Sequence, residues 1–293
     1  MDLLAWPAPR VGLLWSAGVA AALPFEVQEL SSRFHASAAQ VAGEYRRPLD
    51  PPEAQVGRVL GIGWRPLGER GAVAGKVDVG REWLRPASVA LGLESYGGTP
   101  FLPTDTAHPD VARTRVTLEG AGGYRLGSRW AGGIALGYAA LDSRTNRTAL
   151  PRTGRAVSSS AALSIVRSIP SAGLTVAGYV RRSRWTEQAS VREQAARDLV
   201  FELQGFSEPE PVSFSVGYSR RMERDEHGYG IGMAGHALGT TWSAFGELRD
   251  SDEGHSSQFS NDPPTDRWIV SGYALGAAAA RSVGERVAIT ARA

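Results

Sequence analysis

The stretch GAVAGKVDVGRE, residues 71–82, alternates between apolar and polar side chains at every second position. Its three valines fall on one face of an extended chain, whereas Lys76, Asp78 and Glu82 fall on the other, because successive side chains of a strand point to opposite sides. The same split recurs around residues 212–221, where Val, Phe and Tyr alternate with Ser and Gly. We therefore predict strands with one apolar and one polar face along most of the chain.

The predicted strands are long, and their length separates two all-β solutions. Segments such as 114–126, 129–144 and 173–187 exceed ten residues, whereas strands of globular proteins average about five or six. Strands that cross a membrane need ~9 to 11 residues plus an overhang. A soluble β-sandwich would also need bulky side chains facing inward, and glycines such as Gly132 and Gly133 would leave its core thin. Length and composition therefore favour a membrane barrel.

The connections between the predicted strands alternate in length. We predict thirteen strands, at 33–45, 57–67, 72–84, 114–126, 129–144, 154–168, 173–187, 197–206, 211–224, 228–238, 240–250, 267–282 and 285–293. Short connections are expected at 68–71, 127–128, 169–172, 207–210, Gly239 and 283–284. Longer ones are expected at 46–56, 85–113, 145–153, 188–196 and 251–266, with a briefer one at 225–227. Because outer-membrane barrels have tight periplasmic turns and long outer loops, the predicted fold class is all-β: an antiparallel up-and-down transmembrane β-barrel of about 12–14 strands in the bacterial outer membrane.

The two ends of the chain carry separate expectations. Residues 1–30 hold an apolar stretch at 11–23 after Arg10, which we interpret as a signal peptide or a periplasmic N-terminal segment. Residues 31–293 form the predicted outer-membrane barrel. If every short turn is periplasmic, the strand at 285–293 runs outward, whereas such barrels usually have even strand numbers. We therefore expect a barrel that is incomplete at its C-terminus.

Composition excludes several classes of function. The chain has no Cys, so it has no disulfides, thiolate metal sites or cysteine nucleophiles. Its 32 basic and 30 acidic residues are interspersed, which leaves no basic face for nucleic acid. No apolar run reaches the ~20 residues of a membrane-spanning helix. The expected partners are outer-membrane lipid, the barrel-assembly machinery during insertion and small solutes, and no cofactor is expected.

Two sets of residues are the candidate functional positions. Charged side chains on the polar faces of the strands are predicted to line the lumen, where they select solutes in an open channel or pair with one another in a narrow barrel: Lys76, Asp78, Glu82, Arg115, Glu119, Arg181, Glu202, Arg221, Glu247 and Arg249. Aromatic residues near strand ends are predicted to form two interface girdles: Trp64, Tyr124, Trp130, Tyr138, Tyr179, Trp185, Tyr218, Trp242, Trp268 and Tyr273.

Two acidic segments are candidate binding sites. The segment 85–113 contains Glu94, Tyr96, Asp105, His108 and Asp110, and the segment 250–253 is followed by His255. Neither has the ligand spacing of a known metal site, so we interpret both as solvated outer loops. No histidine belongs to a recognisable nucleophile motif. We therefore predict a protein that is not an enzyme and has no catalytic or metal-binding residues.

The region from about Arg33 to Arg167 contains short glycine-based motifs: Gly43-Glu44-Tyr45, the strand pair from Gly61 to Gly80, Tyr96-Gly97-Gly98, Gly122-Gly123-Tyr124, Trp130-Ala131-Gly132-Gly133 and Gly137-Tyr138. On these motifs the chain resembles an uncharacterised family of bacterial outer-membrane β-barrels known mainly from Bacteroidetes-like genomes. The resemblance implies a barrel of unknown function, in longer proteins, with no catalytic residues to carry over.

The leading functional hypothesis is a pore or transport-related barrel for small solutes. Its alternative is a non-conducting structural or interaction barrel that presents the loops 85–113 and 251–266 to partners. An outer-membrane hydrolase is the third hypothesis. Conductance in planar bilayers distinguishes the pore from the non-conducting barrel. Labelling with a serine-reactive probe tests the hydrolase hypothesis.

Overall fold

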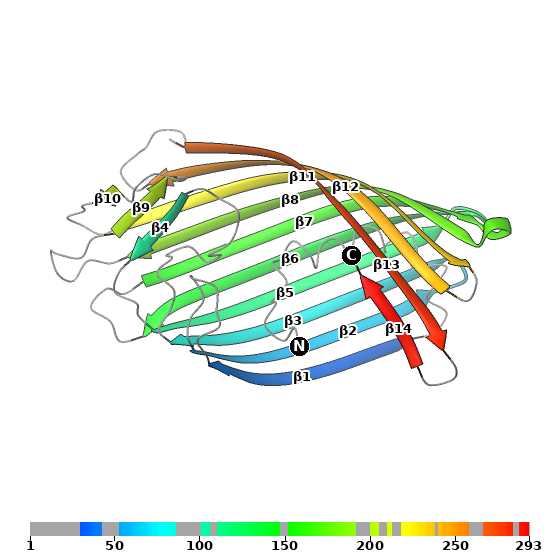
Figure 1. The fold of residues 1–293 in the computed structure, drawn as a ribbon, viewed down its shortest axis with the longest axis horizontal. Helices are drawn as coiled ribbons and strands as arrows, with labels where there is room; N and C mark the ends of the chain where they lie inside the picture. The colour runs from blue at the N-terminus through cyan, green and yellow to red at the C-terminus, as the bar shows by residue number, and fades with distance from the viewer. Residues whose placement is uncertain are drawn as a thin grey trace.

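The computed structural model describes residues 30–42, 53–85, 101–105, 110–146, 152–191, 200–204, 210–212, 218–237, 240–257, 266–283 and 287–292. Nearly all of these residues lie in strands, and eleven strands form one antiparallel sheet, the main sheet (Figure 1). Its strands are β1 Ser31–Ala42, β2 Glu53–Leu67, β3 Gly71–Arg85, β5 Asp110–Arg125, β6 Trp130–Asn146, β7 Arg152–Ile169, β8 Leu174–Val191, β11 Tyr218–Ala237, β12 Thr240–Ser257, β13 Asp266–Val283 and β14 Val287–Arg292. They follow one another in the sheet in chain order. The predicted all-β, antiparallel up-and-down fold is confirmed.

A second, three-stranded sheet is built from segments between the strands of the main sheet. Its strands are β4 Phe101–Asp105, β9 Val200–Gln204 and β10 Glu210–Val212, and β9 lies between the other two. β4 belongs to the connection from β3 to β5, and β9 and β10 belong to the connection from β8 to β11. This small sheet lies at the left-hand end of the main sheet in Figure 1.

The two ends of the main sheet differ in the lengths of the connections that they carry. The connections at 68–70, 126–129, 170–173, 238–239 and 284–286 have at most four residues, and they alternate with longer ones at 43–52, 86–109, 147–151, 192–217 and 258–265. Since the strands are antiparallel, all short connections lie at one end, the short-connection end, and all long ones at the other, the long-connection end. The predicted alternation is confirmed. It has no exception among these ten connections.

Three predicted boundaries are wrong. The segments 211–224 and 228–238 are not two strands, because β11 runs without interruption from Tyr218 to Ala237 and pairs on both sides along this length. The predicted strand 197–206 is replaced by β9 of the small sheet. β12 continues to Ser257, so the predicted loop 251–266 begins later. Within the described residues the main sheet therefore has eleven strands.

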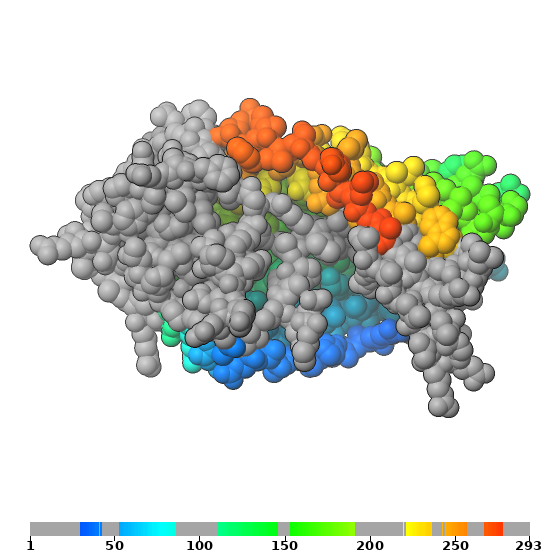
Figure 2. Space-filling model, in the orientation of Figure 1, coloured from blue at the N-terminus to red at the C-terminus, as the bar shows by residue number. Residues whose placement is uncertain are grey.

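The main sheet is curved. It curls so that β13 and β14 come round in front of β2 and β3 in the view of Figure 1, and Figure 2 shows the same arch in space-filling form, with β1 in blue along its lower edge and β13 in orange along its upper edge. Within the described residues, β1 pairs only with β2 and β14 only with β13. In the same part of the chain, no helix is long and apolar enough to cross a bilayer.

The two faces of the sheet differ in exposure. On β6, Ala131 and Ala135 are buried, whereas Ile134 and Leu136 on the opposite face are about half exposed. Side chains converge on the inner side of a curved sheet, so we name the buried side the concave face and the other the convex face. The alternation seen in the sequence therefore separates these two faces.

Candidate functional site: the charged concave face

The convex face carries an apolar band next to the short-connection end. On β6 it consists of Trp130, Ile134, Leu136 and Tyr138, all exposed. From Trp130 to Tyr138 the strand is about 27 Å long at ~3.4 Å per residue, or about 20 Å in height at a barrel tilt of ~40°. This is of the order of the ~25 Å apolar band of outer-membrane barrels. An aromatic side chain stands at each end of the run, as expected where a ring meets headgroups.

Towards the long-connection end the convex face becomes charged. Arg182 on β8 binds Asp225 on β11 through two hydrogen bonds of 3.0 and 2.5 Å, and Arg184 donates to Glu223 at 3.0 Å. Arg267 on β13 binds Asp252 on β12 in the same two-point way, at 2.8 and 2.5 Å. The strands therefore extend beyond the apolar band into a region where both faces are polar.

A buried cluster of charges occupies the middle of the concave face. Arg181 on β8 donates to Glu226 on β11 at 2.6 Å and to Glu247 on β12 at 2.8 Å. Tyr179 donates its hydroxyl to the other oxygen of Glu247 at 2.5 Å, and Arg249 donates to Glu247 at 2.5 Å. We name these five residues the central cluster. Its two guanidiniums and two carboxylates balance, which is the condition under which buried charges are tolerated.

Glycines on β11 make room for the central cluster. Gly228 and Gly230 lie on the concave face between β8 and β12, opposite Arg181 and Tyr179 respectively. A Cβ at Gly230 would stand 2.1 Å from the Tyr179 ring, and one at Gly228 would stand 3.1 Å from a Glu247 oxygen. The Arg181–Glu247 contact therefore crosses the strand between its two partners, because that strand has no side chains there.

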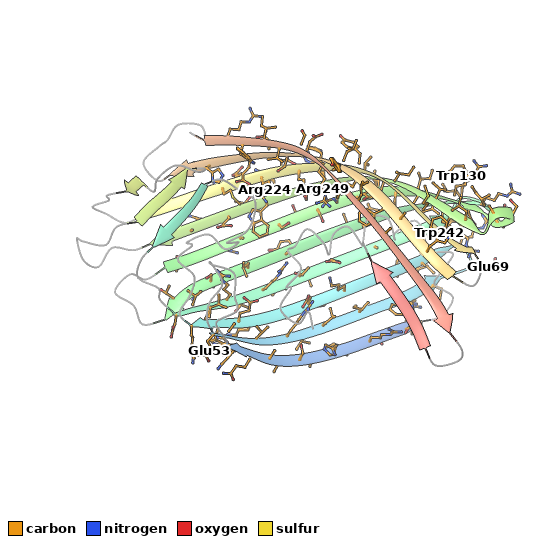
Figure 3. All side chains as sticks on the ribbon, in the orientation of Figure 1. Glu53, Glu69, Trp130, Arg224, Trp242 and Arg249 are labelled. Atoms are coloured by element: carbon orange, nitrogen blue, oxygen red, sulfur yellow. The ribbon has the colours of Figure 1, made fainter. Side chains whose placement is uncertain are left out.

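A second buried group lies nearer the long-connection end. Arg224 on β11 binds Glu253, the residue directly opposite on β12, and His255 Nε2 lies 2.6 Å from the other oxygen of Glu253. We name Arg224, Glu253 and His255 the distal triad. Figure 3 labels Arg224 and Arg249, which represent the two groups on these neighbouring strands.

Two further ion pairs lie on the concave face of the early strands. Lys76 on β3 binds Glu119 on β5 at 3.1 Å, and Arg58 on β2 binds Asp78 on β3 through two hydrogen bonds of 2.8 and 2.5 Å. Their side chains are partly exposed, at 26% for Lys76 and 30% for Arg58. These pairs therefore face open space more than the central cluster does.

The structure places most of the predicted lumen residues on one face. Eight of the ten lie on the concave face: Lys76, Asp78, Glu82, Arg115, Glu119, Arg181, Glu247 and Arg249. Arg221 does not, because it lies on the convex face, where its side chain is 59% exposed and binds Glu223. The side chain of Glu202 lies outside the described residues. A role of the eight residues in a lumen stays a proposal.

The predicted aromatic girdles are divided between the two faces. Tyr124, Trp130, Tyr138, Trp242 and Tyr273 lie on the convex face. Trp64, Tyr179, Trp185 and Trp268 lie on the concave face. The assignment of the aromatic residues to interface girdles stays a prediction. The side chain of Tyr218 lies outside the described residues.

The structure describes the two acidic segments to different extents. Residues 250–255 are part of β12 rather than a loop, and Glu253 and His255 are buried in the distal triad. In the segment 85–113, Glu94, Tyr96 and His108 and the side chain of Asp105 lie outside the described residues, while Asp110 begins β5. Among the residues with described positions, no group of three His, Asp or Glu side chains could hold a metal ion.

Sequence reasoning missed Glu226, Arg224, Glu253 and His255 as concave-face residues. Arg224 and Glu226 continue the period of the glycines at 228 and 230, and Glu253 and His255 continue that of Glu247. Extending the two-residue period past the apolar band would have found them.

The protein is an antiparallel β-protein with long strands, an apolar band on its convex face and charges on its concave face. It belongs to a family of unknown function, DUF6850, whose model matches residues 20–282. The predicted membership in an uncharacterised family is confirmed at this level, while the expected bacterial group stays a prediction. No curated protein matches the chain.

Solved structures similar to this chain are outer-membrane receptors. The pyoverdine-bound FpvA of P. aeruginosa has a TM-score of 0.48 and 10% identity, over 90% of this chain and 38% of that one. BauA, the ferric preacinetobactin receptor of Acinetobacter baumannii, has a TM-score of 0.46 and 9% identity, over 90% of this chain and 42% of that one. Fiu, a ferric-catecholate import receptor of E. coli K12, has a TM-score of 0.46 and 9% identity, over 88% of this chain and 49% of that one. The chain spans less than half the length of each.

Proposed function

We propose that the protein is an outer-membrane β-barrel that serves in the passage of small solutes, with its long connections outside the cell and its short ones in the periplasm. The observation that carries this proposal is the contrast between the two faces of the main sheet. The apolar convex band has a height of the order of that of outer-membrane barrels, and the concave face carries charges from β2 to β12. A soluble sheet would bury the apolar face instead.

The polar face suits a hydrated interior. Its ion pairs lie within one strand, join neighbouring strands or, for Arg181–Glu247, span one strand, so the charges neutralise one another along the wall. The partly exposed pairs Lys76–Glu119 and Arg58–Asp78 are the ones that water and solutes reach. In a channel, such side chains set the selectivity for ions.

Planar-bilayer conductance of the full-length protein tests the proposal. We expect discrete current steps, and we expect Lys76→Gln to shift the reversal potential toward cation selectivity because it uncovers the carboxylate of Glu119. The matched control is Arg221→Gln, which removes the same charge from the convex face and leaves the reversal potential unchanged. Absence of any current step refutes the pore.

The second candidate function is a non-conducting barrel that presents its long connections to partners. The small sheet favours it, because β9 pairs with β4 and thereby joins the two longest connections. A protein that inserts into bilayers without conductance supports this candidate. The same conductance experiment therefore decides between the two.

A further inference from the structure

The short-connection end of the main sheet has an exposed rim of arginines. Arg65 lies on the convex face of β2, Arg70 and Arg129 belong to the connections 68–70 and 126–129, and Arg167 lies on the convex face near the end of β7. All four are exposed. We name these four residues the arginine rim. The only acidic residue in these two connections is Glu69, which, like Trp130, is labelled at the right-hand end of the sheet in Figure 3.

Backbone hydrogen bonds bring members of the rim together. The amide of Arg125, the last residue of β5, donates to the carbonyl oxygen of Arg70 at 2.8 Å, and this bond places the connection 68–70 beside the start of the connection 126–129. The amide of Ser168 donates to the carbonyl oxygen of Arg129 at 2.8 Å, which places Arg129 beside the end of β7. The four arginines therefore lie along the short-connection end of the sheet from β2 to β7, whereas the net charge of the whole chain is only +2.

The arginine rim differs from three arginines of the convex face near the long-connection end. There, Arg182, Arg184 and Arg267 each bind a carboxylate on a neighbouring strand. Within the part of the chain that the structure describes, none of the four rim arginines forms an ion pair. Arg167 lies over the ring of Trp130 instead, 5.2 Å from its centroid. The rim therefore has positive charge that the sheet does not neutralise.

Exposed apolar side chains stand next to the rim. Leu67, Tyr124, Leu126 and Trp130 are each 42% to 66% exposed, and they adjoin the apolar convex band. Tryptophan and tyrosine favour the level of the headgroups, and arginine can extend its charged end to that level while its stem stays in apolar surroundings. Anionic lipid surfaces attract basic groups at such a boundary by about 1 kcal/mol each.

We propose that the arginine rim binds anionic phospholipid headgroups on the side of the membrane where the short connections lie. The ligand is the phosphate of a lipid in the bilayer, because the apolar side chains beside the rim have contacts with its acyl chains and a free anion would not. This inference rests on the proposed membrane insertion. Beyond insertion, the inference names the class of lipid that is bound and the end of the barrel that binds it.

Native mass spectrometry of the full-length protein, in a zwitterionic detergent with equal amounts of phosphatidylglycerol and phosphatidylcholine, tests the inference. We expect a several-fold excess of bound phosphatidylglycerol, and a stepwise fall of that excess as rim arginines are replaced by Gln. The quadruple variant Arg65→Gln, Arg70→Gln, Arg129→Gln and Arg167→Gln is therefore expected to show no preference. Sodium chloride should lower the excess, since it screens exposed charges.

The matched control carries the same loss of charge at the other end of the sheet, with Arg144, Arg155, Arg221 and Arg267 each replaced by Gln; it is expected to keep the preference. A rim variant that keeps the excess, or a control that loses it, overturns the inference. So does displacement of the lipid by inorganic phosphate far beyond the effect of sodium chloride at equal ionic strength, since the site would then bind free anions.

Vesicle insertion separates this inference from the proposed function. If the protein inserts into phosphatidylcholine vesicles but shows no excess of bound phosphatidylglycerol, the proposed barrel stands and the arginine rim is not a lipid site. A protein that inserts into no vesicle refutes both.

Discussion

Replacement of Gly230 by Ala tests whether the central cluster depends on a glycine in the strand beneath it. A Cβ at this position would stand 2.1 Å from Cζ and 2.4 Å from the hydroxyl oxygen of Tyr179. Because β8 and β12 fix the backbone on both sides of β11, the Tyr179 ring must move away and lose its 2.5 Å hydrogen bond to Glu247. A hydrogen bond to a charged acceptor contributes about 1.5–3 kcal/mol, and overpacking costs ~1–3 kcal/mol. We therefore expect Gly230→Ala to lower the free energy of unfolding by about 4 kcal/mol.

Urea unfolding of the protein refolded in detergent measures this loss. With a slope of about 2 kcal/mol per molar urea, the midpoint should fall by about 2 M. Gly272→Ala is the matched control, because Gly272 also lies on the concave face and a Cβ there would have nothing within 4 Å. Its midpoint should stay the same or rise slightly, since Ala restricts the unfolded chain.

A double-mutant cycle with Tyr179→Phe identifies the cause. Both Gly230→Ala and Tyr179→Phe remove the same hydrogen bond to Glu247, so their effects should sum to more than the effect of the double variant. Equal midpoints for Gly230→Ala and Gly272→Ala would refute the dependence of the cluster on the glycine. Strict additivity would show that the hydrogen bond does not contribute to the loss.

Three further predictions concern other charges and a turn. Glu247→Gln should lower the free energy of unfolding by about 3 kcal/mol, because it leaves the buried guanidinium of Arg181 with one carboxylate fewer; an unchanged urea midpoint would contradict this. Arg182→Ala should leave the urea midpoint unchanged, since exposed ion pairs contribute little, and a large fall would show that the convex pairs hold the strands together. Gly68→Ala should cost roughly 1–2 kcal/mol because Gly68 has a φ of 63°, whereas Gly127→Ala, without a positive φ or a neighbour within 4 Å, should cost nothing in the same assay.

The sequence predicts the strands well where their two faces differ. From Gly71 to Arg85 and from Trp130 to Tyr138, apolar and polar or small side chains alternate, and the observed strands follow the prediction closely. The prediction fails in β11, where it places a turn at Asp225, Glu226 and His227. Beyond the apolar band the convex face also carries charges, so the contrast between the faces disappears although the strand continues.

The partners within the concave face could not be predicted from the sequence. The Arg181–Glu247 pair joins residues 66 positions apart, and Tyr179 and Glu247 are 68 apart. Their contact depends on the registers of β8 with β11 and of β11 with β12. A shift of either register by one residue would move every side chain of a strand to the other face. Periodicity therefore identifies the face of a charge but not its partner.

The geometry of the central cluster limits which charges can act on a solute. Two strand spacings, or about 10 Å, separate β8 from β12, and Arg181 and Glu247 meet only because Gly228 and Gly230 leave the intervening strand bare. Both side chains are at most 2% exposed, so this contact joins three strands within the wall. Lys76 remains partly exposed while it is paired with a carboxylate. Selectivity should therefore respond to Lys76, whereas changes at the central cluster should alter stability first.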